Sequence, residues 1–116
     1  MVRKNYIPAR GDLVWMDFSP HRGHEQGGRR PAVVISLKMY NERSGLALVC
    51  PITSKRKDYP FEVEIKERKV GGFVLADQVR GADWKARRAE FVSAVAAEVL
   101  EEIEDKISAL LGKMRP

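Results

Sequence analysis

The sequence predicts a mainly β fold, in which a small bent sheet or barrel carries one helix at its C-terminal end. Two observations lead to this fold class. Short apolar or alternating runs recur between glycine-rich and polar turns along most of the 116 residues, which is typical of strands. Near Ala94 the apolar period changes from two to nearly four, which indicates an amphipathic helix.

The expected strands are short runs that end at glycine, proline or a polar cluster. They cover residues 13–18, 32–37, 46–52, 61–65, 73–75 and 88–92. Pro51 is expected to break the third run, because proline cannot donate a ladder hydrogen bond. Residues 41–45 are expected to turn the chain before that run.

The last expected element is a helix over about residues 94–112. Its apolar residues fall on one face, and Gly112 is a natural C-terminal stop. This stripe predicts a contact with the core or with a second subunit, and it consists of Val95, Val99, Ile103, Ile107 and Leu110. No internal repeat or linker is visible, so residues 1–116 are expected to form a single domain.

Composition narrows the class of protein. Apolar residues make up 44% and charged residues 32% of the chain, and no apolar stretch approaches the roughly 18 residues that a membrane span needs. The N-terminus lacks the apolar segment of a signal peptide. Cys50 is the only cysteine, so no intrachain disulfide can form, and it is expected to be a small core residue. We therefore expect a soluble, cytoplasmic protein.

Charge is unevenly distributed along the chain. Residues 1–93 contain eighteen basic and eleven acidic side chains, whereas residues 94–116 contain three basic and five acidic ones. A basic body with an acidic helix is consistent with a face that binds a polyanion. Ordinary solubility charge explains the same imbalance, and composition does not decide between the two.

Several kinds of site have no support in the sequence. His21 and His24 are the only histidines, and Cys50 is distant, so no zinc-binding spacing occurs. Neither the phosphate-binding nor the dinucleotide-binding glycine fingerprint is present, and neither is the nucleophile elbow of serine hydrolases. We therefore expect no metal and no cofactor.

Two polar clusters follow apolar runs and carry the candidate chemistry. A glycine-rich segment contains Glu25 and ends at Arg30, which Pro31 biases towards an extended shape. Thr53 and the lysines after it form the second cluster. Such a set can support attack of an RNA 2′-hydroxyl on its own phosphate, because the substrate supplies the nucleophile and the protein orients it and stabilises charge.

Within this hypothesis each residue has a role. A guanidinium fits phosphate oxygens, and lowering its pKa to neutrality would cost about 8 kcal/mol, so Arg30 is assigned to charge stabilisation. Thr53 adds a hydroxyl donor, and Glu25 is the better candidate base by pKa. Arg29 adjoins Arg30, and the sequence leaves open which arginine contacts the reacting phosphate.

Five blocks of sequence carry a resemblance to a known family. They are Gly11 to Phe18, Gly23 to Val34, Pro51 to Thr53, Tyr59 to Val63 and Leu75 to Arg80. In this order and spacing they resemble the MazF/PemK family of toxin endoribonucleases from bacterial toxin-antitoxin systems, over nearly the whole chain.

The resemblance implies a barrel related to SH3 barrels, a homodimer, and cleavage of single-stranded RNA at short motifs. Such cleavage is metal-independent, leaves a 2′,3′-cyclic phosphate and a 5′-hydroxyl, and inhibits translation and growth until a cognate acidic antitoxin neutralises the toxin. The family's arginine, threonine and glutamate match Arg30, Thr53 and Glu25, and its loop lysine matches Lys57. Gln78 is expected to read a base edge.

Phe18 ends the first expected strand beside the glycine-rich segment. It could stack on an RNA base or pack in the core, and the sequence does not separate these roles.

Two other classes of protein compete with this interpretation. Toxins that poison gyrase share the architecture and end in tryptophan-glycine-isoleucine, whereas this chain ends in Lys113-Met114-Arg115-Pro116. A non-catalytic RNA-binding barrel would need only Phe18 and the basic face.

Overall fold

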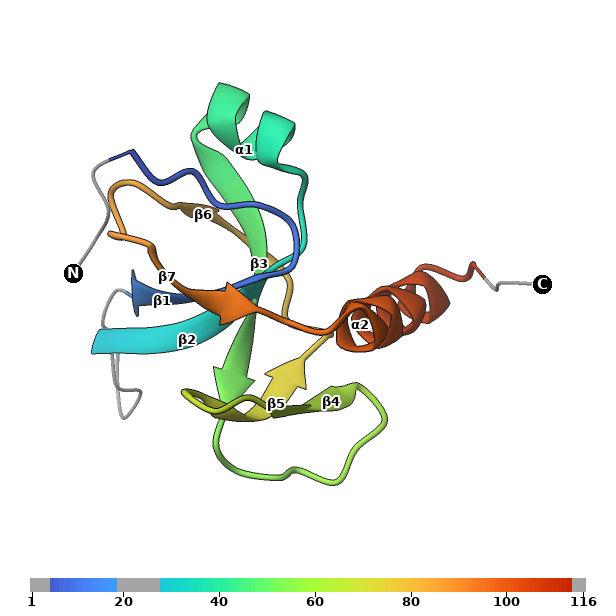
Figure 1. Ribbon diagram of the computed structural model, residues 1–116. Coiled ribbons are helices and arrows are strands. Elements are labelled where there is room, and N and C mark those ends of the chain that lie inside the picture. The colour runs from blue at the N-terminus through green and yellow to red at the C-terminus, as the bar shows by residue number, and fades with distance from the viewer. Residues whose placement is uncertain (1–4, 19–27, 114–116) are drawn as a thin grey trace.

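The computed structural model describes residues 5–18 and 28–113 (Figure 1). Within this part of the chain the strands are β1 (Asp12–Phe18), β2 (Gly28–Val34), β3 (Leu46–Thr53), β4 (Glu62–Lys66), β5 (Gly71–Leu75), β6 (Arg80–Asp83) and β7 (Glu90–Ala94). The helices are α1 (Lys38–Ser44) and α2 (Ala97–Leu110). The expected mainly β fold with a C-terminal helix is confirmed.

The strands form one strongly curled antiparallel sheet in the order β4-β5-β3-β2-β1-β7. The long strand β3 links its two parts: residues Leu46 to Val49 pair with β6, whereas Ile52 and Thr53 pair with β5. The first half of β3 thus pairs with β6 and its end pairs with β5, and the sheet bends between these two parts (Figure 1).

Alternation along the strands divides the core into two clusters, because successive side chains point to opposite faces. Leu13, Val33 and Cys50 belong to the cluster that α2 covers, and all three are fully buried. Of the expected apolar stripe, Ile103 is fully buried and Leu110 remains 48% exposed. The second cluster lies on the other face of β1, β2 and β3 and includes Val14, Met16, Phe18, Val34 and Val49.

The short helix α1 is a correction to the sequence prediction, because the expected turn at residues 41–45 forms the helix end and its cap. Asn41 is fully buried and donates to the carbonyl oxygens of Pro8 and Ser36 at 2.8 and 3.1 Å. Gly45 closes the helix in the left-handed conformation. The helix thus depends on tertiary hydrogen bonds that a sequence pattern does not reveal.

Pro51 does not break β3, which is a second correction. It pairs with Ala32 at the end of the β2–β3 ladder, and it lies between the part of β3 that pairs with β6 and the part that pairs with β5. A missing N–H is tolerated at such a position.

Other differences concern bounds and one missed strand. β6 was not expected, β2 starts at Gly28 and ends at Val34, and β7 and α2 span residues 90–94 and 97–110. Within the described residues, no helix is both long and apolar enough to cross a membrane.

Candidate functional site

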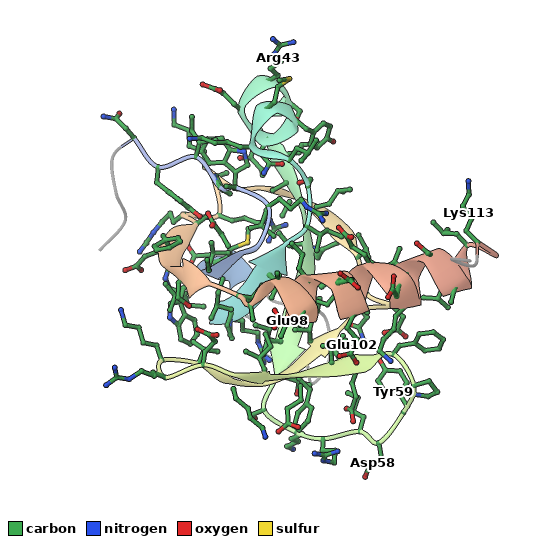
Figure 2. All side chains as sticks on the ribbon, turned by 45° about the vertical axis from the view of Figure 1, so that its right-hand side comes forward. Arg43, Asp58, Tyr59, Glu98, Glu102 and Lys113 are labelled. Carbon is green, nitrogen blue, oxygen red and sulfur yellow. The ribbon has the colours of Figure 1, made fainter. Side chains whose placement is uncertain are left out.

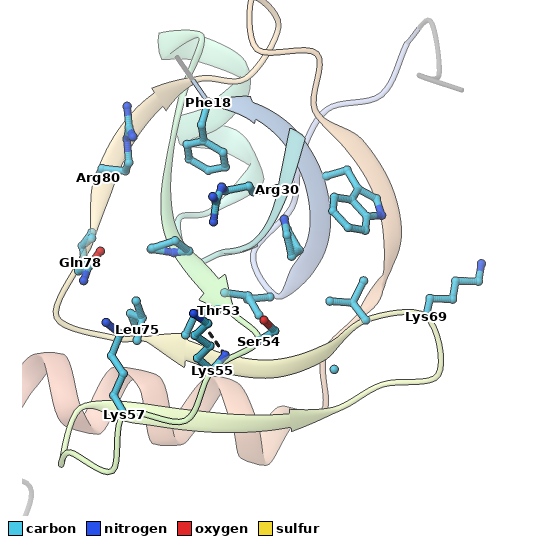
Figure 3. A pocket seen from close by; sticks show the side chains of 17 residues that line it. Phe18, Arg30, Thr53, Ser54, Lys55, Lys57, Lys69, Leu75, Gln78 and Arg80 are labelled. Carbon is cyan, nitrogen blue, oxygen red and sulfur yellow. Dashed lines mark hydrogen bonds between the residues drawn. The ribbon is translucent and has the colours of Figure 1, made fainter. Parts of the chain in front are cut away.

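A groove of about 1390 Å³ lies beside the bend in β3, and five of the six predicted site residues line it (Figure 3). They are Phe18, Arg30, Thr53, Lys57 and Gln78, from β1, β2, the end of β3, the loop after it and the segment before β6. The sixth residue, Glu25, lies outside the described residues. Side chains from distant parts of the sequence therefore meet at one surface.

The groove exists because β2 is longer than its ladder with β3. The last β2–β3 pair is Ala32 with Pro51, and the residues of β2 before it pair only with β1. We call residues 16–18 and 28–30 the β1–β2 tip. Arg30 lies on this tip, pairs with Met16 and is exposed on the groove.

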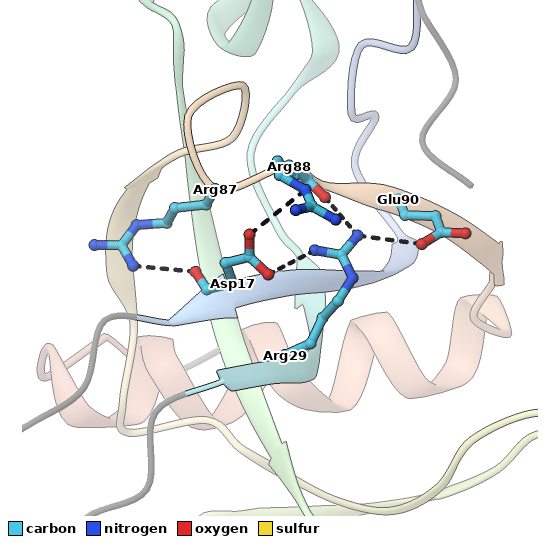
Figure 4. Close-up of polar contacts among 5 residues, drawn as sticks. All are labelled: Asp17, Arg29, Arg87, Arg88 and Glu90. Atoms are coloured by element: carbon cyan, nitrogen blue, oxygen red, sulfur yellow. Dashed lines mark hydrogen bonds and ion pairs between the residues drawn. The ribbon is translucent and has the colours of Figure 1, made fainter.

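The two adjacent arginines have different surroundings. Arg29 is half-buried outside the groove, and its guanidinium donates to Asp17 Oδ1 at 2.9 Å, to Arg88 O at 2.6 Å and to Glu90 Oε1 at 3.1 Å (Figure 4). Arg30 lines the groove with Thr53, as Figure 3 shows. Strand alternation sends these neighbours to opposite faces, so Arg30 lines the groove and Arg29 does not.

Thr53 is half-buried at the end of β3, where the strand meets the floor of the groove. Its Oγ1 accepts a hydrogen bond from the backbone N–H of Lys55 at 3.2 Å, and the hydroxyl proton can still be donated. On its other side Thr53 pairs with Phe73 of β5. Neighbouring Gly72 lies so close that a Cβ there would be 2.4 Å from the Thr53 carbonyl oxygen.

The loop over residues 54–60, which we call the lysine loop, carries Lys57 into the groove. The carboxylate of Glu62 accepts from the backbone N–H groups of Lys57 and Asp58 at 2.8 and 3.0 Å. The Tyr59 hydroxyl donates to Asp77 at 2.5 Å, and burial followed by the bond to Asp77 raises the pKa of Tyr59 to about 12. The backbone at Lys57 and Asp58 is thus bonded to β4, and the Tyr59 side chain is bonded to the connection between β5 and β6. The loop lies below α2 in Figure 2.

Phe18 is only 7% exposed and packs with the second core cluster. The guanidinium carbon of Arg80 lies 5.3 Å from its ring centroid, a cation–π geometry. Packing is therefore the role that the structure shows for Phe18, and stacking on an RNA base stays a prediction that would require Arg80 to move.

Three other cations line the groove: Lys55, which belongs to the predicted second cluster without an assigned role, and Lys69 and Arg80, which sequence reasoning missed. The available signal for Arg80 was its position two residues after Gln78. Lys55 stands in a run of three basic residues, which is typical of a solvated surface. Lys69 lies in the β4–β5 connection, and only the folded sheet brings that connection beside the groove.

Electrostatically the groove is cationic. Among the described residues that line it are five basic side chains and no Asp or Glu. Glu98 and Glu102 are exposed on α2 (Figure 2), and no described residue of α2 lines the groove. Such a surface concentrates a polyanion. Within residues 5–18 and 28–113, no group of three or more His, Cys, Asp or Glu side chains is placed to hold a metal ion.

Comparison with known proteins decides the family. The model of the PemK-like, MazF-like toxins of type II toxin-antitoxin systems matches residues 9–111. The chain belongs to this toxin family. It is 48% identical over 107 residues to the endoribonuclease toxin MazF of Escherichia coli strain K12, covering 92% of this chain and 96% of the relative.

Solved structures of MazF-like toxins have the same fold. The crystal structure of MazF (Form-I) from Deinococcus radiodurans superposes with a TM-score of 0.85, at 50% identity over 93% of this chain and 99% of the other. A MazE-MazF structure (Form-II) from the same organism gives 0.86, at 50% identity over 93% and 98%. Every described groove residue lies within the part of this MazF-like chain that the family model matches.

Proposed function

We propose that this endoribonuclease of the MazF-like family cuts single-stranded RNA by attack of a 2′-hydroxyl on the adjacent phosphate. The reaction forms a 2′,3′-cyclic phosphate and releases a 5′-hydroxyl, and it needs no metal. The observation that supports it is the placement of the Arg30 guanidinium and the Thr53 hydroxyl in one cationic groove. Because the 2′-hydroxyl is part of the substrate, the protein has only to orient the phosphate and stabilise its developing charge.

Arg30 is the residue best suited to that charge. A planar guanidinium donates to two phosphate oxygens at once, and it remains charged at every physiological pH. Thr53 donates its hydroxyl to the same phosphate from the floor of the groove. Glu25 is proposed as the general base that takes the proton of the 2′-hydroxyl.

The rim of the groove is proposed to hold the RNA on either side of the cut. Lys57 is exposed and is assigned to a flanking phosphate, and the exposed amide of Gln78 is assigned to a base edge. Cleavage at short sequence motifs follows, because a side chain that pairs with a base edge discriminates among bases. Phe18 is assigned to a base stack that replaces its contact with Arg80.

We propose a cognate acidic antitoxin as the protein partner. A disordered acidic segment that occupies the groove would pair with the cations that RNA otherwise contacts. A MazE-MazF crystal structure exists for the relative from Deinococcus radiodurans. Without the antitoxin, cleavage of messenger RNA in the cytoplasm would stop translation and growth.

We also propose that the toxin is a homodimer. Large apolar side chains are exposed together on α1 and the adjoining start of β3, between 38% and 64% of each: Leu37, Met39, Tyr40, Leu46 and Leu48. An apolar patch of this kind marks an interaction surface, and a second copy of the chain would cover it. Sedimentation should give twice the mass of the chain, and a monomer at micromolar concentration would contradict the proposal.

The test of the activity is digestion of a mixed RNA by the purified protein in excess chelator, followed by mapping of the cut positions and end groups. We expect cuts at a short motif with 2′,3′-cyclic phosphate ends. Arg30→Ala should lower the rate by about 100- to 1000-fold while the protein stays folded. The control is Arg10→Ala, since Arg10 pairs with Glu104 of α2 and does not line the groove.

Two results would contradict the proposal. Robust cleavage by the Arg30→Ala protein would exclude the assigned site. Binding of RNA by the wild-type protein without cleavage would favour a non-catalytic RNA-binding barrel.

A further inference from the structure

The β1–β2 tip carries both Phe18 and Arg30, yet it has little support from the sheet. On one side the ladder with β3 ends at Ala32, and on the other the ladder with β7 ends at the pair Trp15 and Glu90. An isolated pair of strands is marginally stable in water. Met16 and Phe18 anchor one face of the tip by packing in the second core cluster, and the opposite face needs a connection of its own.

Arg29 makes that connection. Its guanidinium donates to three acceptors on three segments: Asp17 on the partner strand of the tip, the carbonyl of Arg88 between β6 and β7, and Glu90 at the start of β7 (Figure 4). The Arg29 side chain is 26% exposed, so these bonds are partly shielded from water. Charge-assisted hydrogen bonds of a planar guanidinium are strong and geometrically specific.

The segment that receives Arg29 is itself bonded to the tip. The backbone N–H of Asp17 donates to Arg87 O at 2.8 Å, and Arg87 Nη1 donates to Asp17 O at 3.2 Å. Arg88 has a positive φ of 54°, and its carbonyl is the one that accepts from Arg29 at 2.6 Å. Residues that carry a Cβ rarely adopt a positive φ, and here the surrounding hydrogen bonds hold Arg88 in that conformation.

We propose that Arg29 is a positioning residue for RNA cleavage, an inference that rests on the proposed function of the groove. Its guanidinium ties the β1–β2 tip to the β6–β7 connection and thereby holds Arg30, on the opposite face of the same strand, over Thr53. Loss of the tie lets the tip move, and a displacement of about 1 Å at a reacting group can lower a rate by about 100-fold.

The experiment compares Arg29→Gln with Arg10→Gln. Both variants lose one positive charge from an ion-paired arginine, but only Arg29 connects the tip to the segment between β6 and β7 and to β7. We expect Arg29→Gln to lower kcat by about 10- to 100-fold with KM within about twofold of wild type, and Arg10→Gln to keep kcat. Arg29→Lys should recover only part of the loss, since one ammonium cannot replace the guanidinium fork.

Amide hydrogen exchange tests the same claim without any activity. Arg29→Gln should speed exchange at Phe18 and Arg30 and leave Val33, in the core of β2, unchanged. Asp17→Ala should produce the same change, and the double variant should add little, because both substitutions remove the Arg29–Asp17 hydrogen bond.

The outcomes separate the two proposals. If the wild-type protein does not cut RNA in chelator, the proposed function fails. The amide exchange rates of Phe18 and Arg30 then decide whether Arg29 holds the tip in place. If it cuts and Arg29→Gln behaves as Arg10→Gln does in both kcat and exchange, the positioning role is overturned. A loss of thermal stability with parallel losses in kcat and affinity would assign Arg29 a structural role only, which also overturns it.

Discussion

The β1–β2 tip and the lysine loop lie on two sides of the same groove, and they are held by different interactions. The tip presents Arg30 and is tied by ion pairs between side chains, from Arg29 to Asp17 and Glu90. The lysine loop presents Lys57 and is held by hydrogen bonds from its own backbone N–H groups to Glu62. One cation is thus fixed through a neighbouring side chain and the other through its own main chain.

This difference has a consequence for function. A strand fixes which face a side chain occupies, so a tie on one face can orient the residue on the other. In the lysine loop Glu62 holds Lys57 by its main chain, which leaves the long Lys57 side chain mobile. We therefore expect disturbance of the tip to lower kcat, and disturbance of the lysine loop to weaken RNA binding.

The largest effect is expected for Gly72→Ala, on β5 beside Thr53. Gly72 has φ of +141°, and an added Cβ would lie 2.4 Å from the carbonyl oxygen of Thr53, so β5 must move away from β3. We expect a loss of about 2–3 kcal/mol in the free energy of unfolding, together with slower cleavage. Denaturant unfolding measures the first quantity.

The matched control is Gly71→Ala, where the nearest atom to the added Cβ is 3.9 Å away. Equal stability of the two variants would show that the close approach of Gly72 to Thr53 has no energetic weight.

The next effect concerns the lysine loop. In Glu62→Gln the amide nitrogen cannot accept a hydrogen bond, so one of the two bonds to Lys57 and Asp58 is lost. We expect KM for RNA to rise by about fivefold to tenfold, in line with the upper part of the ~0.5–1.5 kcal/mol that a typical hydrogen bond contributes, while kcat changes less. Steady-state cleavage kinetics separate the two parameters.

Glu64→Gln is the control, because Glu64 is on the same strand and pairs only loosely with exposed Arg56, at 3.7 Å. In a Lys57→Ala background, Glu62→Gln should have almost no further effect on KM. A fall in kcat at constant KM would remove the distinction between the two sides of the groove.

Cys50 reports on β3, the strand that lies between the two sides. Burial, and secondarily the charge of Asp77, raise the pKa of its thiol from 9.0 to about 12. Above pH 9 the unfolded chain therefore releases this proton and the folded chain keeps it, so stability falls as pH rises from 9 to 12. The fall attributable to Cys50 approaches about 1.4 kcal/mol per pH unit.

The measurement is the free energy of unfolding across this pH range for wild type and Cys50→Ala. The wild-type protein should lose stability more steeply than the variant. Parallel curves would show that the thiol ionises equally in both states.

The smallest effect is expected for Tyr59→Phe, which removes the hydrogen bond to Asp77 at the partly exposed end of the lysine loop. The loss should be about 0.5–1 kcal/mol in the free energy of unfolding. Tyr40→Phe, on the exposed face of α1, is the comparison. A loss above that of Gly72→Ala would show that Tyr59, and not the β3–β5 contact, dominates this side of the groove.

Much of this architecture follows from local patterns in the sequence. Apolar alternation marks most of the strands, the change of period marks α2, and the motif residues Arg30, Thr53, Lys57 and Gln78 all reach one groove. The strands and α2 are predictable because each depends on a short stretch of chain, whereas the common site of the four motif residues was implied by the resemblance to the toxin family.

The features that were missed depend on contacts between distant segments. Asn41 anchors α1 through Pro8 and Ser36, and β6 is a four-residue strand with a single buried residue, Ala82. The separation of Arg29 from Arg30 depends on the pairing register with β1, in which Arg29 faces Asp17. No local pattern records that register.

The central claim is that the RNA supplies its own nucleophile to a phosphate held between Arg30 and Thr53. The most direct measurement compares two synthetic RNAs that share the mapped cleavage motif and differ only in a single 2′-deoxy nucleotide on the 5′ side of the cut. The account predicts that the purified toxin cuts the all-ribose strand in chelator and leaves the substituted bond intact. Cleavage of both strands at the same rate would contradict it.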